Sequence, residues 1–181
     1  IFGGQTPRAR AEEIKETDSW INVMRMLKDK VFISNFEHSV WFVEEKSKKT
    51  WGHATTGREF EMERDDDFLS KILETNPTEI KFAHTHPQAI LKAFDISVDG
   101  VTRMNRDGRS VSISPSLGDI DTTIVYQALV HESSPETKFS HTVADPAGNW
   151  SIEMDLKHPY AQAVLQFEKT VQKLKKHLPQ K

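Results

Sequence analysis

The sequence predicts an α/β protein of the α+β type, in which helices flank a central β-sheet. Apolar residues recur at helical spacing in long stretches near both ends of the chain. Between these stretches lie short runs rich in β-branched and aromatic residues, separated by turn-forming residues. With 181 residues, the chain is long enough to form one domain with a hydrophobic core.

We divide the chain into a lead-in and one domain. Residues 1–7 contain a Gly-Gly pair followed by Pro7, which is typical of a flexible linker. Residues 8–181 form the predicted domain. Because the chain begins with Ile1 rather than Met, we expect it to be part of a longer polypeptide.

The first half of the domain is predicted to contain a helix, a hairpin and a second helix. Apolar spacing predicts a helix over about 8–28. The β-forming run 40–43 and the returning segment 50–54 predict a hairpin, because a charged tract suited to a solvated turn separates them. The acids at 65–67 precede the apolar stretch 68–73 and suit the N-terminus of a helix.

The second half is predicted to alternate strands and helices. A short apolar strand ends in the segment 80–86, and a helix runs from Asp119 to about Val130. Two strands follow over 136–143 and 150–154, around a Pro- and Gly-containing turn. Apolar steps of three and four predict a last helix over 159–178. We expect this helix to pack against the sheet, with a helix–helix seam to a partner as the alternative.

The segment 81–87 carries the clearest sign of chemistry. Successive side chains of a strand alternate faces, so His84 and His86 point the same way. Two such imidazoles can bind one metal ion, whereas a buried pair without metal needs several hydrogen-bond partners. With eight histidines in the chain, His-x-His alone also arises by chance. We place His131 and His141 too far along the chain to join the pair.

A third ligand is available at the entry to the helix that follows. Ser116 and Asp119 stand three residues apart, which is the spacing of a capping box with Ser as the N-cap. The same geometry would let Asp119 complete a set with His84 and His86, leaving a fourth position open for water as catalytic zinc sites require. Both interpretations remain open at this point.

The sequence His-Thr-His-Pro at 84–87, followed by Ser116-x-x-Asp119, resembles the signature of the JAB/JAMM (MPN-domain) zinc metalloprotease family, as a divergent bacterial-type member. The resemblance implies a central mixed β-sheet of the MPN/JAB (cytidine deaminase-like) type, flanked by helices. It also implies Zn²⁺ bound by His84, His86 and Asp119. Ser116 would then help to stabilise the oxyanion.

The chain departs from that family in one spacing. The second histidine and the serine are separated by positions 87–115, which is 29 residues and far more than is usual in the family. We interpret the excess, about 88–113, as an insertion. It contains a predicted hairpin, because Asp-Gly at 107–108 lies between the alternating segments 101–104 and 110–113.

The resemblance further implies a catalytic glutamate on an early strand. We favour Glu37, because it opens the run that leads into the strand 40–43. The alternatives are Glu44, Glu59 and Glu61.

The implied activity is hydrolysis of an amide or isopeptide bond in a protein or peptide substrate, ubiquitin-like proteins included. A catalytically inactive MPN-type scaffold and a different metal-dependent hydrolase are the alternatives. A net charge of −3 and the lack of an apolar run near the roughly 20 residues of a membrane span argue against nucleic-acid and membrane partners. The absence of cysteine leaves a cytosolic protein and a delivered effector or toxin module both open.

Overall fold

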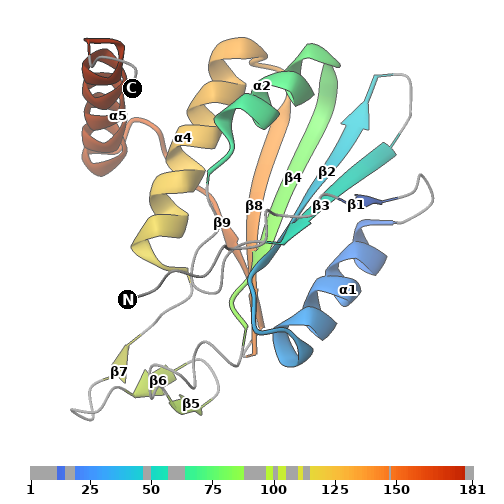
Figure 1. Cartoon of the computed structure of the whole chain (residues 1–181). Helices are drawn as coiled ribbons and strands as arrows, with labels where there is room; N and C mark the ends of the chain where they lie inside the picture. The colour runs from blue at the N-terminus through green and yellow to red at the C-terminus, as the bar shows by residue number, and fades with distance from the viewer. Residues whose placement is uncertain are drawn as a thin grey trace.

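The structure is a computed structural model, and it describes residues 12–14, 19–46, 50–56, 64–87, 97–99, 102–104, 110–111, 115–146 and 148–177. In these residues, helices cover both faces of a mixed six-stranded sheet (Figure 1). The strand order is β1-β3-β2-β4-β8-β9, and among these described strands only the β4–β8 pair is parallel. The predicted α+β class with a sheet flanked by helices is therefore confirmed.

In the described residues, the helices separate groups of one to four strands. The first half contains β1 (Glu12–Ile14), α1 (Trp20–Ile33), β2 (His38–Glu45), β3 (Thr50–Thr56), α2 (Asp66–Glu74) and β4 (Pro77–Thr85). The predicted insertion contains β5 (Ser97–Asp99), β6 (Thr102–Met104) and β7 (Ser110–Val111). The remainder contains α4 (Leu117–Ser133), β8 (Lys138–Asp145), β9 (Gly148–Ile152) and α5 (Pro159–His177).

The predicted helix over 8–28 is wrong in its first part. Residues 12–14 form the edge strand β1, which pairs with β3, and α1 begins only at Trp20. The side chain of Ser19 caps α1 by accepting a hydrogen bond from the backbone N–H of Asn22. The apolar spacing merged a short strand with the helix that follows it.

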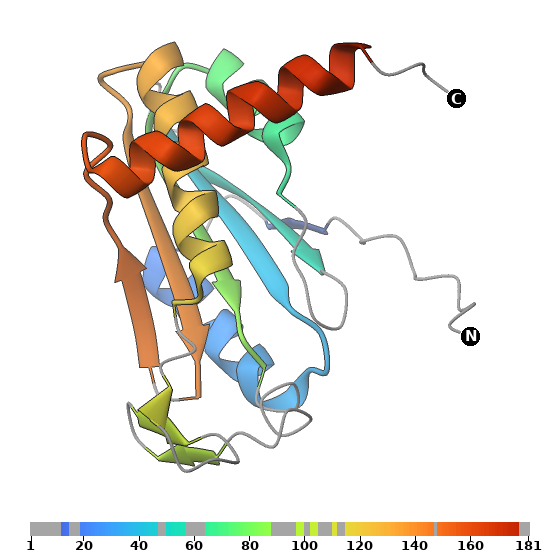
Figure 2. The same ribbon diagram turned by 90° about the vertical axis from the view of Figure 1, so that its left-hand side faces the viewer.

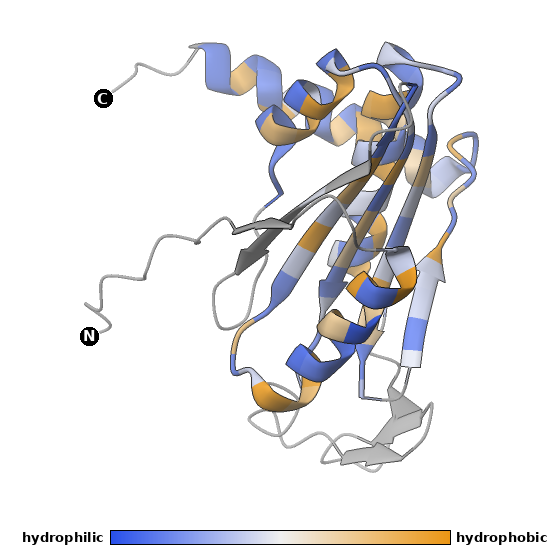
Figure 3. Cartoon of the chain, turned by 90° about the vertical axis from the view of Figure 1, so that its right-hand side faces the viewer, coloured by the Kyte–Doolittle hydropathy of each residue, from blue (hydrophilic) through white to orange (hydrophobic). Residues whose placement is uncertain are grey.

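Each face of the sheet carries its own apolar layer. Trp41 and Phe82 are cross-strand neighbours, and they pack with α2 and α4 on one face. Val40 and Ala83 are also paired, and they pack under α1 on the opposite face. Figure 3 shows α1 lying over this face of the sheet. Side chains alternate along a strand, so His84, two residues after Phe82, points to the face covered by α4.

The last helix does not lie on the sheet. α5 packs mainly on the outer side of α4, and Ala161 is buried there (Figure 2). Phe167 and Leu174 stay 67% and 60% exposed. The predicted packing against the sheet is wrong because α4 already covers that face, while the alternative of a seam with a partner stays a prediction. Of the helices described, none is long and apolar enough to cross a membrane.

The strands β5, β6 and β7 form a small sheet of their own, within the segment predicted to be an insertion. β6 and β7 pair antiparallel, with Arg103 opposite Val111, so the predicted hairpin is confirmed. β5 pairs with the other edge of β6 and adds a third strand to the predicted two. Figures 1 and 2 both place this small sheet at the end of the molecule where β4 ends.

Candidate metal centre

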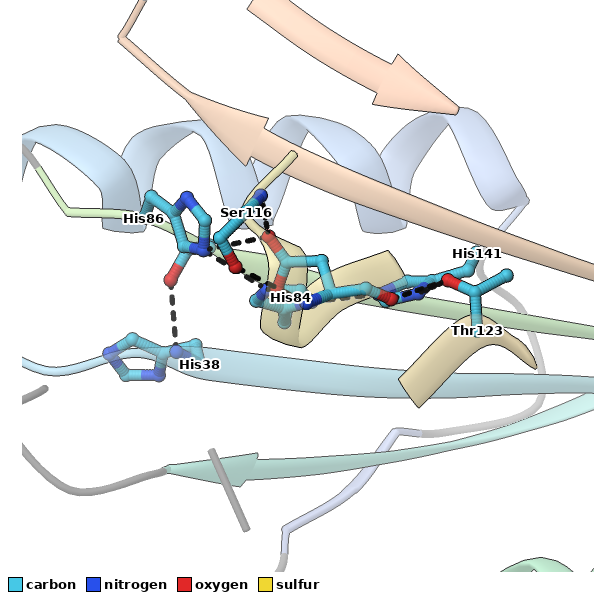
Figure 4. A network of polar contacts seen from close by, with 8 residues as sticks. His38, His84, His86, Ser116, Thr123 and His141 are labelled. Atoms are coloured by element: carbon cyan, nitrogen blue, oxygen red, sulfur yellow. Dashed lines mark hydrogen bonds and ion pairs between the residues drawn. The ribbon is translucent and has the colours of Figure 1, made fainter. Parts of the chain in front are cut away.

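The three predicted metal ligands come together at one end of the sheet. His84 lies near the end of β4, His86 follows that strand directly, and Asp119 lies in the first turn of α4. One ligand atom from each residue lies within 4.8 Å of the other two. Figure 4 shows His84, His86 and Ser116 gathered at this point, with Thr123 and His141 continuing the contacts away from it.

The atoms that face one another are all able to bind a metal ion. Nε2 of His84 lies 2.9 Å from Oδ1 of Asp119, and Nε2 of His86 lies 3.5 Å from Oδ2. The two Nε2 atoms are 3.3 Å apart. The side chain of His86, at 13% exposed, is the most accessible of the three, against 6% for His84 and 10% for Asp119.

The two interpretations of Ser116 and Asp119 are compatible. Asp119 accepts a hydrogen bond from the backbone N–H of Ser116 at Oδ2, at 2.6 Å, and its own N–H donates to Ser116 Oγ at 3.2 Å. This is the predicted capping box. Because the cap holds Oδ2, it also aims Oδ1 at His84. The cap therefore orients the carboxylate toward the histidines.

The charges of the three residues are coupled. Burial alone would raise the pKa of Asp119, but the imidazoles of His84 and His86, both close to its carboxylate, outweigh it and hold that pKa well below its ordinary value. Burial lowers the pKa of His84, and contact with Asp119 offsets this only in part. Burial would also lower the pKa of His86, but contact with Asp119 and two nearby carboxylates together raise it. The metal-free site therefore favours an ionised Asp119, a neutral His84 and a proton on His86.

Glu37 is one of the two carboxylates that act on His86. It directly precedes β2 and is only 8% exposed. Ser39 is the cross-strand partner of His84, so Glu37, two residues before Ser39, shares its face and lies next to His86 along the same ladder. The negative charge of Glu37 contributes to the raised pKa of His86. The structure thus brings the favoured glutamate to the histidine pair.

Of the three alternative glutamates, the structure describes Glu44. Glu44 lies at the far end of β2, on the face covered by α1, where Oε1 is 3.9 Å from Nζ of Lys81. It is remote from the histidine pair and is no candidate for the base. Glu59 and Glu61 lie outside the described residues.

His141 corrects one prediction, because it lies beside the site despite its distance along the chain. β8 runs parallel to β4, and His141 pairs with Phe82, so its side chain shares the face of His84. Nε2 of His141 lies 2.9 Å from Nδ1 of His84, and Nδ1 lies 2.6 Å from Oγ1 of Thr123. Burial holds the pKa of His141 well below its ordinary value. His131, by contrast, is exposed on α4, away from the site as expected.

Asp145 is a second residue of the site that no pattern in the sequence identified. It is fully buried and ends β8, and the β4–β8 register continued by one residue sets it beside His86. Its charge adds to the raised pKa of His86, while Oδ1 accepts a hydrogen bond from the N–H of Gly148 at 2.9 Å. The Asp-Pro-Ala-Gly turn was visible in the sequence, but the parallel pairing that brings it to the site was not.

The donor set fits a zinc ion. Two imidazole nitrogens and one carboxylate oxygen are ligands that catalytic zinc sites use. Ligands bound tetrahedrally about 2.0–2.1 Å from zinc lie roughly 3.3 Å from one another. The separations between the three residues, from 2.9 to 3.5 Å, bracket that value. Only small shifts of these side chains would be needed to admit the ion.

Comparisons with known proteins give no assignment. No family model, curated protein or solved structure matches the chain. Any function assigned to the chain must therefore follow from the chemistry of its own site residues.

Proposed function

We propose that this protein is a zinc-dependent hydrolase of the JAB/JAMM (MPN-domain) type, which cleaves an amide or isopeptide bond in a protein or peptide. One observation carries the proposal. Ligand atoms of His84, His86 and Asp119 converge within 4.8 Å at the end of a sheet, in a donor set suited to a catalytic metal. The MPN-type fold is part of the proposal, and the mixed sheet with helices on both faces agrees with it.

Each site residue would have a different role in the reaction. A zinc ion bound by the two histidines and Asp119 would supply a water molecule with a pKa near 7 and an electrophile for the scissile carbonyl. Glu37, next to His86 and almost buried, would take the proton of that water and pass it to the leaving amine.

Ser116 would bind the developing oxyanion. Its Oγ accepts the N–H of Asp119, which leaves the hydroxyl proton available to donate to a substrate oxygen. Loss of such a donor typically reduces the rate on the order of 10²–10³-fold. The N-terminal end of α4 adds a favourable partial positive charge at the same place.

Metal content tests the proposal first. Elemental analysis of the purified protein should find one zinc ion per chain, and His86→Ala should lose it. His131→Ala is the matched control, because His131 is exposed on α4 and should leave the zinc content unchanged. A wild-type protein that binds no zinc would refute the metal site.

Hydrolysis is tested next, on peptide and isopeptide-linked substrates that include ubiquitin chains. Cleavage should stop when a chelator removes the metal and return when zinc is restored. A protein that binds zinc but cleaves none of these bonds would instead support an inactive MPN-type scaffold or an enzyme for small amides.

A further inference from the structure

A continuous line of polar contacts leads from the candidate metal centre into the interior. Nδ1 of His84, on the side of the ring away from Asp119, lies 2.9 Å from Nε2 of His141. Nδ1 of His141 lies 2.6 Å from Oγ1 of Thr123. That hydroxyl donates in turn to the backbone carbonyl of Asp119, at 2.7 Å. Figure 4 shows this line running from His84 through His141 to Thr123.

The direction of each hydrogen bond follows from the last member of the line. A backbone carbonyl can only accept, so the single hydroxyl proton of Thr123 points at the carbonyl of Asp119. The oxygen of Thr123 must then accept from His141, which requires a proton on Nδ1 of His141.

The tautomer of His84 follows from that of His141. His141 is fully buried, with the ring of Phe82 at a centroid distance of 4.8 Å, and burial of this kind favours the neutral imidazole. A neutral His141 with its proton on Nδ1 has a lone pair on Nε2. It therefore accepts from Nδ1–H of His84. The lone pair of a neutral His84 is left on Nε2, the atom that faces Asp119.

We propose that Thr123 and His141 are positioning residues that lock His84 in its Nδ1–H tautomer, with Nε2 ready to bind a metal ion. The metal part of this inference rests on the proposed function, but the tautomer is a property of the metal-free protein. The line ends at the backbone carbonyl of Asp119, and the carboxylate of the same residue is a candidate ligand. The turn of α4 from Asp119 to Thr123 thus orients the carboxylate of Asp119 and sets the tautomer of His84.

The locked tautomer leaves two acceptor atoms facing each other, Nε2 of His84 and Oδ1 of Asp119. With a lone pair on Nε2, His84 cannot donate to the carboxylate of Asp119, although the two atoms are only 2.9 Å apart. A positive charge beside both atoms would satisfy them. A bound metal ion would supply that charge.

Nitrogen-15 NMR of the imidazole rings in the metal-free protein tests the tautomers directly. In the wild type at neutral pH, His84 and His141 should both carry their proton on Nδ1. In Thr123→Val, which removes the hydroxyl and keeps the side-chain shape, both tautomers of His84 should appear. Thr123→Ser should restore the wild-type spectrum. A wild-type His84 protonated on Nε2 would overturn the inference.

Zinc affinity, measured by competition with a chromophoric chelator, tests the consequence. Loss of an outer-shell partner typically weakens metal binding by about 10- to 100-fold, which is the loss expected for Thr123→Val. Thr137→Val is the matched control, because Thr137 is also buried and donates to a backbone carbonyl, that of Pro77 at 2.7 Å. Equal affinities in Thr123→Val, Thr137→Val and the wild type would overturn the positioning role.

The two proposals can fail separately. A protein with the expected tautomers that binds no zinc would refute the proposed function and still support the tautomer lock. A protein that binds zinc with Nδ1 of His84 as the ligand atom would keep the metal site and overturn the lock.

Discussion

Replacing Asp119 with Asn removes the one negative charge among the three candidate ligands and leaves a side chain of nearly the same shape. In the wild type, Oδ2 accepts from the N–H of Ser116 at 2.6 Å, and Oδ1 lies 2.9 Å from Nε2 of His84. Asn can keep the first contact with its carbonyl oxygen and donate its amide N–H to His84 in the second. We therefore expect Asp119→Asn to fold normally and to lose zinc.

The expected effect of Asp119→Asn on the stability of the metal-free protein is much smaller than its expected effect on stabilisation by zinc. Loss of an N-terminal helix cap costs about 1 kcal/mol, so a variant that keeps the cap should unfold within about that margin of the wild type when metal is absent. Zinc at 1,000 times its dissociation constant would stabilise the wild type by about 4.1 kcal/mol. For a chain of this length each kcal/mol shifts the melting temperature by about 2–4 °C. Zinc should thus raise the wild-type melting temperature by roughly 8–16 °C and leave that of Asp119→Asn almost unchanged.

Differential scanning calorimetry of the metal-free protein, with and without added zinc, measures both quantities. His131→Ala serves as the control and should show the full zinc-induced shift. An equal shift in Asp119→Asn and the wild type would show that Asp119 is no ligand. A metal-free Asp119→Asn several kcal/mol less stable than the wild type would refute the account of its two hydrogen bonds.

Three further predictions concern other parts of the structure. Glu37→Gln should keep its zinc by elemental analysis and lose hydrolysis by about 10²–10⁴-fold, because Gln cannot accept the proton of the attacking water. His141 has a pKa well below its ordinary value, so below about pH 6.5 the unfolded chain binds a proton that the folded chain does not. The free energy of unfolding of the metal-free protein should therefore fall as pH drops from about 7 to about 5, and His141→Gln should flatten that fall by up to about 1.4 kcal/mol per pH unit in urea titrations. Asp65→Ala should lower the free energy of unfolding by about 1 kcal/mol, because Asp65 Oδ1 caps α2 by accepting from the N–H of Phe68 at 2.8 Å.

Each of these predictions has an outcome that contradicts it. Full hydrolysis by Glu37→Gln would remove Glu37 from the mechanism. Equal pH dependence of His141→Gln and the wild type would show that His141 gains its proton as easily in the folded chain. An Asp65→Ala variant as stable as the wild type would show that water replaces the cap, and Asp67→Ala, an exposed neighbour, is the control for the lost charge.

Signals that act over a few residues were readable from the sequence. The capping box at Ser116 and Asp119 and the shared face of His84 and His86 follow from the geometry of a helix start and of a strand. The hairpin of β2 with β3 and the turn between β8 and β9 follow from local turn chemistry. Contacts of this kind are fixed by spacing alone.

Signals that depend on which elements meet were not readable. The place of His141 depends on β8 pairing with β4, and no local pattern specifies the partner of a strand or its direction. The position of α5 on α4 had the same cause, since an apolar stripe does not identify what it covers. The short edge strand β1 was not predicted, because three residues are too few to show the alternation of a strand.

The parallel pairing of β4 with β8 explains how the site can form across the long connection between His86 and Ser116. Parallel neighbours need a crossover connection, and in this fold the crossover is α4, which begins at the end of the sheet where β4 stops. His84 and Asp119 therefore meet because of where strand and helix are packed, whatever the length of chain between them. Each doubling of a flexible connection costs only about 0.6 kcal/mol in closure entropy. The buried contacts of β4 and α4 with the rest of the core can offset that cost, which is why spacing along the chain is a weaker criterion for this site than the βαβ unit that builds it.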